Sequence, residues 1–222
     1  FADLNNNPNS KTDLNLRRAW ELNYRNGIPG LKAQLKVEDF QTLDETIEDK
    51  DKPYARLPQF LLNYVTGNPQ GLQYEFNNDT AYFKKSINDG SALESSGTRI
   101  YNQFAVRYNY ITPSWFYAIP ELSVRTINTF YDQDTKEGLG LSASDDLEKS
   151  VVVPQFTFAT GVTFEKDGKY LQSISPRAFY AYSPYKKQDD HPNFDSTTAS
   201  ISYDQLFNPY RFYGHDRLED NN

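Results

Sequence analysis

The chain has 222 residues, a net charge of -7 and a pI of about 4.9, and this acidic balance argues against a nucleic-acid binder, which would carry a basic face. It contains no cysteine and only two histidines, so within these residues disulfides and thiolate metal sites are excluded and a histidine-based catalytic or metal site is disfavoured. No stretch approaches the roughly 18 successive apolar residues of a membrane helix. Any role in a membrane would therefore require β-strands closed into a barrel.

Apolar and polar side chains alternate through most of the chain, which is typical of strands with two different faces. The clearest case is the stretch 151–182, where Phe156 and Phe158 share one face while Gln155 and Thr157 share the other. The 17 tyrosines and 15 phenylalanines also favour strands and suit the aromatic girdles of outer-membrane barrels. In chain order, strands are predicted near 12–25, 30–42, 57–66, 71–84, 99–111, 115–131, 150–165 and 169–183.

The predicted connections alternate in length. They are short at 26–30, 66–71, 112–114 and 166–169, and long at 43–56, 85–98, 132–150 and from 183 onward. Outer-membrane barrels have short periplasmic turns and long extracellular loops. We therefore predict an all-β fold, an antiparallel up-and-down transmembrane β-barrel, of which residues 1–222 form about eight strands of a larger barrel. Residues 184–222, called the tail below, are predicted to be an extracellular loop.

Three prolines, Pro120, Pro154 and Pro176, fall on the apolar face of predicted strands. Because proline lacks the backbone N–H that a central strand donates, we expect bulges or strand starts at these positions. A change of phase near Phe40 predicts a further bulge.

Several short motifs go beyond the strand pattern, and most of them follow residue 150. They are 54–59 (YARLPQ), 153–156 (VPQF), 164–168 (FEKDG), 175–177 (SPR), 181–185 (AYSPY), 193–196 (NFDS), 203–207 (YDQLF), 211–214 (RFYG) and 216–217 (DR). Together they resemble the LptD (OstA/Imp) family of outer-membrane LPS-assembly proteins.

The resemblance implies a non-enzymatic translocon in the outer membrane of a Gram-negative bacterium, which inserts lipopolysaccharide into the outer leaflet. It also implies contact with membrane lipid, a lipoprotein plug, LptE, and an LptA bridge reached through a periplasmic jelly-roll domain. This chain lacks that domain, the family's cysteines, and the first and last strands of the barrel. Since it also begins at Phe1 without a methionine, we expect an interior arc of the barrel wall, and the lateral gate and the disulfides cannot be placed on it.

Charged side chains alternate in sign on the face predicted to line the lumen. The simplest interpretation is a ladder of cross-strand ion pairs, each contributing about 0.2–1 kcal/mol. The alternative is contact with the plug or with lipopolysaccharide, for which the candidates are Arg107, Arg125, Arg177, Glu121 and Glu165. The three arginines are favoured, because guanidinium matches phosphate. The full predicted ladder is Arg17, Lys36, Arg99, Arg107, Arg125 and Arg177 with Glu21, Glu38, Glu75, Glu121 and Glu165.

The tail is too aromatic for a free loop, and we predict that it is ordered and folds over the barrel mouth or into the lumen. Its motif residues are Asp195, Tyr203, Phe207, Tyr213, Asp216 and Arg217.

Two other sites in the tail are considered and not adopted. Ser196, His215 and Asp216 could be imagined as a hydrolase set, but no nucleophile-elbow spacing supports it. A divalent cation near lipopolysaccharide phosphates could use oxygen ligands, but the spacing matches no known loop, so we predict neither a metal nor a cofactor. The residues concerned are His191, Asp189, Asp190, Asp195 and Asp204.

Three alternatives remain open at this stage. One is a porin or receptor-type barrel, although the tail motifs are foreign to porins. Another is a soluble β-protein that binds carbohydrate on Tyr and Trp platforms. The last is a small barrel in which the eight strands close on themselves, which strand number alone permits.

Overall fold

A computed structural model describes residues 15–90, 95–113, 115–132, 148–188, 191–199 and 204–218, and only the backbone of Ser95, Asp204 and Gln205. The described chain is almost entirely β-structure, and neither of its two 3₁₀ helices is long or apolar enough to cross a membrane. The strands are β1 (Asn15–Arg25), β2 (Leu31–Thr42), β3 (Ala55–Gly67), β4 (Leu72–Lys85), β5 (Ser95–Tyr108), β6 (Tyr110–Ile111), β7 (Phe116–Tyr131), β8 (Glu148–Val162), β9 (Phe164–Lys166), β10 (Gln172–Ile174), β11 (Arg177–Tyr182), β12 (Thr197–Thr198) and β13 (Phe212–Tyr213), and the 3₁₀ helices are η1 (Asp49–Asp51) and η2 (Asp204–Phe207).

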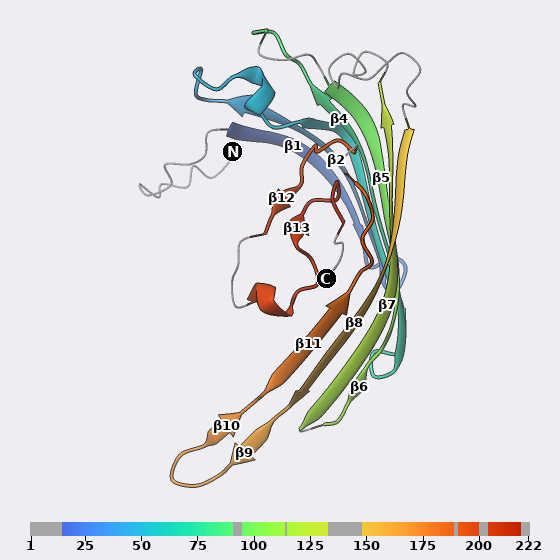
Figure 1. Cartoon of the computed structure of the whole chain (residues 1–222), viewed down its shortest axis with the longest axis vertical. Helices are drawn as coiled ribbons and strands as arrows, with labels where there is room; N and C mark the ends of the chain where they lie inside the picture. Colours follow the sequence, from blue (N-terminus) through green and yellow to red (C-terminus); the bar gives the residue numbers. More distant parts are fainter. Residues whose placement is uncertain are drawn as a thin grey trace.

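One large antiparallel sheet dominates the fold and curves along its length (Figure 1). Its strands follow chain order, β1-β2-β3-β4-β5-β7-β8-β11, with β6 beside β7, while β9–β10 and β12–β13 form two small separate sheets. The prediction of an all-β, antiparallel fold is confirmed. In the described part of the chain β1 and β11 are free edges of the sheet, so the alternative of a small barrel closed by these strands is wrong.

Tight turns join the strands at one end of the sheet. In the β1–β2 turn Asn26 and Gly30 both have positive φ, 66° and 78°, which suits asparagine and glycine. The Gly30 carbonyl accepts a hydrogen bond from the Val65 N–H at 3.0 Å. A Cβ on Gly30 would lie 1.9 Å from the Val65 carbonyl oxygen, so only glycine lets the turn approach β3 this closely.

Three of the predicted strands are interrupted in the structure. The predicted strand 99–111 starts earlier, at Ser95, and breaks at Asn109, whose N–H donates to the Gly71 carbonyl at 2.8 Å. The predicted strands 150–165 and 169–183 are each interrupted, at Thr163 and at the segment before Arg177. Thr163 donates its N–H to the Trp115 carbonyl at 2.7 Å, which continues the β7–β8 register, and the Val162 N–H donates to the Pro176 carbonyl at 3.1 Å on the other side.

The prolines lie where a neighbouring ladder has ended. Pro120 lies between Ala118, which pairs with β6, and Glu121, the first β7 residue that pairs with β5, and Pro154 lies beyond the last β8–β11 pair. The expected bulges at these two positions are wrong, because the β7–β8 register continues through both. Pro176 lies between β10 and β11 and separates them. The bulge predicted near Phe40 is found a few residues earlier, as a register shift between Lys36 and Glu38.

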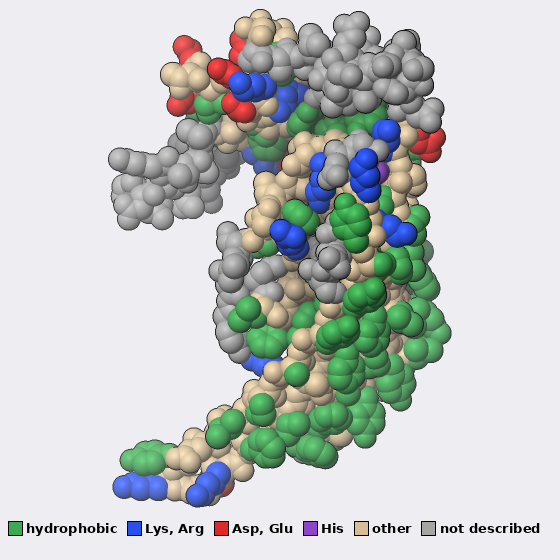
Figure 2. All heavy atoms as spheres, in the orientation of Figure 1, with side chains coloured by type: hydrophobic (Ala, Val, Ile, Leu, Met, Phe, Trp, Pro, Cys, Tyr) green, Lys and Arg blue, Asp and Glu red, His purple; other side chains and the backbone are tan. Residues whose placement is uncertain are grey.

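The two faces of the sheet differ as the alternation predicts. The outer face is the convex one, where Figure 2 shows hydrophobic side chains gathered over the lower half, and Leu122 and Phe158 are 64% and 36% exposed there. The inner face is the concave one, on which the tail lies (Figure 1). On that face Gln155 and Thr157 are only 4% and 8% exposed, and Gln155 donates to the Ser183 hydroxyl at 2.9 Å.

Two small apolar clusters lie on the inner face, beneath the tail. Phe194 of the tail packs on Phe83 and Ala81, with Tyr54 beside them. Leu218 of the tail joins the second cluster, which contains Tyr101, Ile127, Val151 and Val153. The hydrophobic core therefore lies between tail and wall, and it fixes the tail against the middle strands.

Candidate functional site

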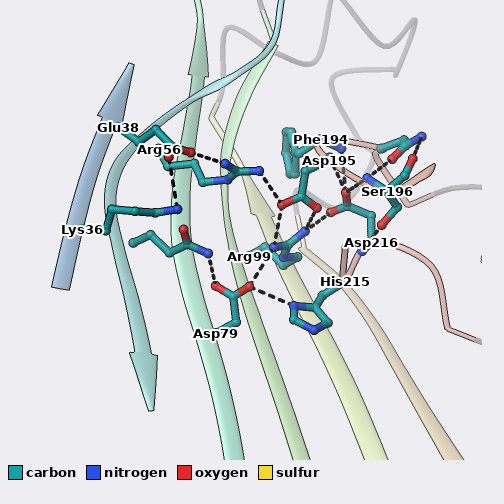
Figure 3. Close-up of polar contacts among 12 residues, drawn as sticks. Lys36, Glu38, Arg56, Asp79, Arg99, Phe194, Asp195, Ser196, His215 and Asp216 are labelled. Atoms are coloured by element: carbon teal, nitrogen blue, oxygen red, sulfur yellow. Dashed lines mark hydrogen bonds and ion pairs between the residues drawn. The ribbon is translucent and has the colours of Figure 1, made fainter. Parts of the chain in front are cut away.

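A buried arginine on β5 holds the tail to the wall (Figure 3). The side chain of Arg99 is 0% exposed, and its Nη1 donates to Asp195 Oδ1 at 2.5 Å and to Asp216 Oδ1 at 2.8 Å. Its Nη2 donates to Asp79 Oδ2 on β4 and to Asp195 Oδ2, both at 3.2 Å. The planar guanidinium thus bridges one wall carboxylate and two tail carboxylates, a fork that an ammonium group does not provide. We call Arg99, Asp79, Asp195 and Asp216 the clamp.

Asp216 also ties the two arms of the tail to each other. Its Oδ2 accepts the backbone N–H groups of Phe194, Asp195 and Ser196 at 2.9, 2.7 and 3.1 Å. In return the Ser196 hydroxyl accepts the Asp216 N–H at 2.7 Å. Gly214, with φ of 80°, permits the close approach, since a Cβ there would lie 2.6 Å from the Asp195 carbonyl oxygen. The tail therefore presents its carboxylates to Arg99 as one preorganised unit.

A second charged group lies beside the clamp on β1, β2 and β3. Glu38 is 2% exposed and pairs with Arg17, with Arg56 and, at 3.3 Å, with Lys36. Arg56 in turn donates to Asp195 Oδ2 at 3.1 Å and so joins this group to the clamp. Burial raises the pKa of the Asp195 carboxyl, but the nearby charge of Arg99 and its hydrogen bond outweigh burial, and the pKa lies well below its ordinary value.

Aromatic rings complete the contact between tail and wall. The rings of Phe194 and Phe83 stack with centroids 4.6 Å apart and an interplanar angle of 4°. His215 stacks on Tyr101 at 4.0 Å, and its Nδ1 lies 2.8 Å from Asp79 Oδ2. The tail is thus held by apolar contact and charge together.

Between the wall and residues 208–218 of the tail lies a half-open cavity of about 650 Å³. On the wall side it is lined by Gln34, Asn63, Asn77 and Gln103 among others, and on the tail side by Tyr210, Phe212, Tyr213 and His215.

The predicted lumen charges are only partly brought together. Arg107 pairs with Glu75 and, at 3.4 Å, with Glu121, which is the cross-strand ladder expected from the simplest interpretation. Glu165 is exposed on β9, in the small β9–β10 sheet, and pairs in register with Ser173 instead of joining the ladder.

The other two candidate arginines reach aromatic rings of the tail. Arg125 is 1% exposed, and its guanidinium lies 5.4 Å from the centre of the Tyr210 ring. Arg177 is exposed and lies 5.6 Å from the centre of the Phe207 ring. Both wall arginines therefore face the tail.

Most of the predicted tail motif belongs to this contact. Asp195 and Asp216 are in the clamp, and Arg217 donates to the backbone carbonyls of Pro192, Asp216 and His191 at 3.0, 3.0 and 2.9 Å. Tyr213 is 59% exposed in β13. Tyr203 lies outside the described residues.

The two sites not adopted from the sequence have other arrangements. The Ser196 hydroxyl is bonded to the Asp216 N–H and His215 to Asp79, so these side chains serve the tail–wall contact and do not form a catalytic triad. Of the proposed metal ligands, Asp189, Asp190 and the Asp204 side chain lie outside the described residues. Within the described part of the chain no three His, Asp or Glu side chains gather as a metal site would require.

Two central residues of the clamp were not singled out from the sequence. Arg99 was predicted only as one member of the lumen ladder, and Asp79 was not among the predicted lumen charges. A signal for Asp79 does exist, since it is the one carboxylate within the amide-rich segment 77–79, at a position that alternation assigns to the inner face.

Comparison with known proteins identifies the family. The sequence matches the family described as "LptD: LPS transport system D" over residues 1–222. LPS-assembly protein LptD of Acinetobacter baumannii is 78% identical and that of Acinetobacter baylyi 73% identical, each over 100% of this chain. LptD of Neisseria meningitidis serogroup B is 32% identical over 98% of the chain.

The chain spans about a quarter of these relatives, 27%, 27% and 26% of their lengths. Their names describe assembly and transport, which agrees with the prediction that the chain is not an enzyme. The match over every residue confirms the family resemblance, and the chain belongs to the LptD family.

Proposed function

We propose that this chain is an interior arc of an outer-membrane β-barrel that inserts lipopolysaccharide into the outer leaflet of a Gram-negative bacterium. The observation that carries the proposal is the two-sided sheet. Large apolar side chains such as Trp20 and Leu122 are 58% and 64% exposed on the outer face, while charged groups such as Arg99 and Glu38 are buried on the inner face. A soluble sheet would bury the apolar face and expose the charged one.

The strand dimensions support a position in a bilayer. About 9–11 tilted residues are enough to cross one, and β4, β5, β7 and β8 have 14, 14, 16 and 15 residues. Unpaired strand edges are not tolerated in hydrocarbon, because their N–H and C=O groups find no partner there. The free edges at β1 and β11 therefore favour further strands on both sides and a larger closed barrel.

The partners that we propose are those that the family resemblance implies. Lipid covers the outer face. The inner face lines a lumen in which the lipoprotein LptE docks as a plug and through which lipopolysaccharide passes. The LptA bridge would be reached through a domain outside this chain. Arg177 is the best-placed wall arginine for the plug or for lipopolysaccharide, because Arg107 is paired with carboxylates and Arg125 is buried beneath Tyr210.

Depletion of the full-length protein in its host separates this proposal from the porin alternative. We expect lipopolysaccharide to disappear from the cell surface and to accumulate at the inner membrane and periplasm, while uptake of a small probe such as nitrocefin does not fall. Surface lipopolysaccharide can be measured by antibody labelling of intact cells. Unchanged surface lipopolysaccharide together with reduced nitrocefin uptake would instead support a diffusion porin.

A further inference from the structure

We propose that the tip of the β9–β10 hairpin anchors the sheet in the periplasmic leaflet of the membrane, where Lys166 and Lys169 bind the phosphate groups of phospholipids. This inference rests on the proposed function, because outer-membrane barrels have their short turns on the periplasmic side. The hairpin extends past the tight-turn end of the sheet, at the lower left of Figure 1. Within the described part of the chain its two strands pair only with each other.

The hairpin continues the β8–β11 ladder without a change of register. The Val162 N–H donates to the Pro176 carbonyl at 3.1 Å, one step beyond the β8–β11 pairs, and Phe164 pairs with Ile174 two steps further along. Residues two apart in a strand point to the same side of a sheet. Phe164 and Ile174 therefore continue the outer face, in line with Phe158, and the apolar row of that face extends into the hairpin.

Large apolar side chains are concentrated on the hairpin and have little cover from the described chain. Phe164 and Ile174 are 62% and 71% exposed, and Tyr170 and Leu171 in the turn are 70% and 74% exposed. A contiguous apolar surface of this kind marks contact with a membrane or with a partner protein. A membrane fits it better, because the surface prolongs the face that the proposed function places in lipid and because tyrosine is enriched where hydrocarbon meets water.

The charges of the hairpin follow the order that a membrane boundary requires. Lys166 lies two residues after Phe164 and so on the outer face, whereas Glu165 between them lies on the inner face. In the turn, Lys169 Nζ lies 5.7 Å from the centre of the Tyr170 ring, and Figure 2 shows basic side chains at this tip. Along the outer face the hairpin therefore passes from apolar to cationic side chains, as a strand does that leaves acyl chains and reaches phosphates. Lysine suits this boundary, because its alkyl stem stays in the apolar layer while the ammonium reaches the headgroups.

Spin labels placed one at a time on the hairpin of the full-length protein in phospholipid vesicles test its position. We expect accessibility to oxygen to be severalfold higher at Phe164 and Ile174 than at Glu165 and Ser173, and accessibility to a water-soluble nickel chelate to show the opposite order. Nickel accessibility that is highest at Phe164 and Ile174 would place the hairpin in water. Low accessibility to both reagents there would show that protein covers it, and either result overturns the proposal.

A label at Leu122 separates this proposal from the proposed function. If Leu122 is accessible to oxygen while Phe164 and Ile174 are accessible to nickel, the sheet lies in lipid and only the anchor is wrong. If Leu122 is itself accessible to nickel, the lipid-facing wall of the proposed function fails as well.

Charge reversal tests the contact with phosphate. The unfolding equilibrium constant of the full-length protein is measured in vesicles with and without the anionic lipid phosphatidylglycerol, for the unmodified protein and for Lys166→Glu with Lys169→Glu. Since each lysine near an anionic membrane surface changes an equilibrium constant about fivefold, we expect the stabilisation by phosphatidylglycerol to be at least about fivefold smaller in the double variant. If that variant does not fold, Lys166→Gln with Lys169→Gln removes the charges without adding acids.

The matched control is Lys186→Glu with Lys187→Glu, which makes the same change of charge at two exposed lysines of the tail. The tail lies on the inner face, away from lipid, so this variant should respond to phosphatidylglycerol as the unmodified protein does. An equal response of the hairpin variant and the unmodified protein, or an equal loss in the tail variant, would overturn the proposal.

Discussion

Replacing Arg99 by methionine is expected to reduce the stability of the docked tail by about 3–5 kcal/mol, the usual cost of removing one partner from a buried ionic group. The change leaves Asp79, Asp195 and Asp216 close together without the guanidinium that neutralises them. The tail then separates from the wall to hydrate its carboxylates. The measurement is the urea dependence of protease cleavage within residues 184–222 of the full-length protein in detergent.

Arg18 provides the control for Arg99. It pairs with Asp39 at 2.7 Å, but its side chain is 59% exposed, and exposed pairs contribute under about 1 kcal/mol. Arg18→Met should therefore leave cleavage of the tail unchanged. Arg99→Lys should fall between wild type and Arg99→Met, since an ammonium keeps the charge but loses the fork. A tail that is equally protected in Arg99→Met and Arg18→Met would show that the clamp does not hold it.

An arginine at Leu122 is expected to destabilise the barrel by about 2–4 kcal/mol, which is the cost of a lipid-facing Arg near the middle of a bilayer. Leu122 is near the centre of β7 and 64% exposed on the outer face. A water-facing side chain with that exposure would accept arginine almost without cost. The free energy can be taken from reversible unfolding of the full-length protein in lipid vesicles.

Phe130 is the matched position for this prediction. It lies on the same strand and the same face, next to the last residue of β7, and is 39% exposed. Phe130→Arg should cost only about 0–1 kcal/mol, because the penalty falls near the membrane interface. The prediction rests on the difference in unfolding free energy between the two variants, because that difference cancels any general effect of adding a charge. If arginine destabilises the protein equally at both positions, the outer face does not lie against hydrocarbon.

The sequence pattern was sufficient to predict the strands and their two faces, because alternation is a local property. Phe158 is exposed and Gln155 buried, as a lipid-facing and a lumen-facing position should be. The interruptions at Asn109 and Thr163 were not predictable in the same way. At both positions the backbone N–H still bonds in register to the neighbouring strand, Asn109 to Gly71 and Thr163 to Trp115, and the side-chain alternation carries no sign of the interruption.

The candidate site was only partly predicted, because its residues lie far apart in the sequence. The tail motif drew attention to Asp195 and Asp216, but their partner Arg99 lies 96 and 117 residues away in the sequence. Alternation assigns Arg99 to the inner face without indicating which of several inner arginines meets the tail. That choice is made by packing, where Phe194 and Leu218 fit the apolar clusters of the wall and so place the carboxylates over Arg99.

The central claim is that the outer face meets hydrocarbon and the inner face meets water. Spin labels placed one at a time on Pro120 to Ile127 of β7 in the full-length protein, reconstituted in lipid vesicles, test it directly. The account predicts that accessibility to oxygen and to a water-soluble nickel chelate alternate with period two and in opposite phase, with oxygen highest at Leu122 and Val124. Nickel accessibility that is highest at Leu122 and Val124, or no alternation at all, would contradict it.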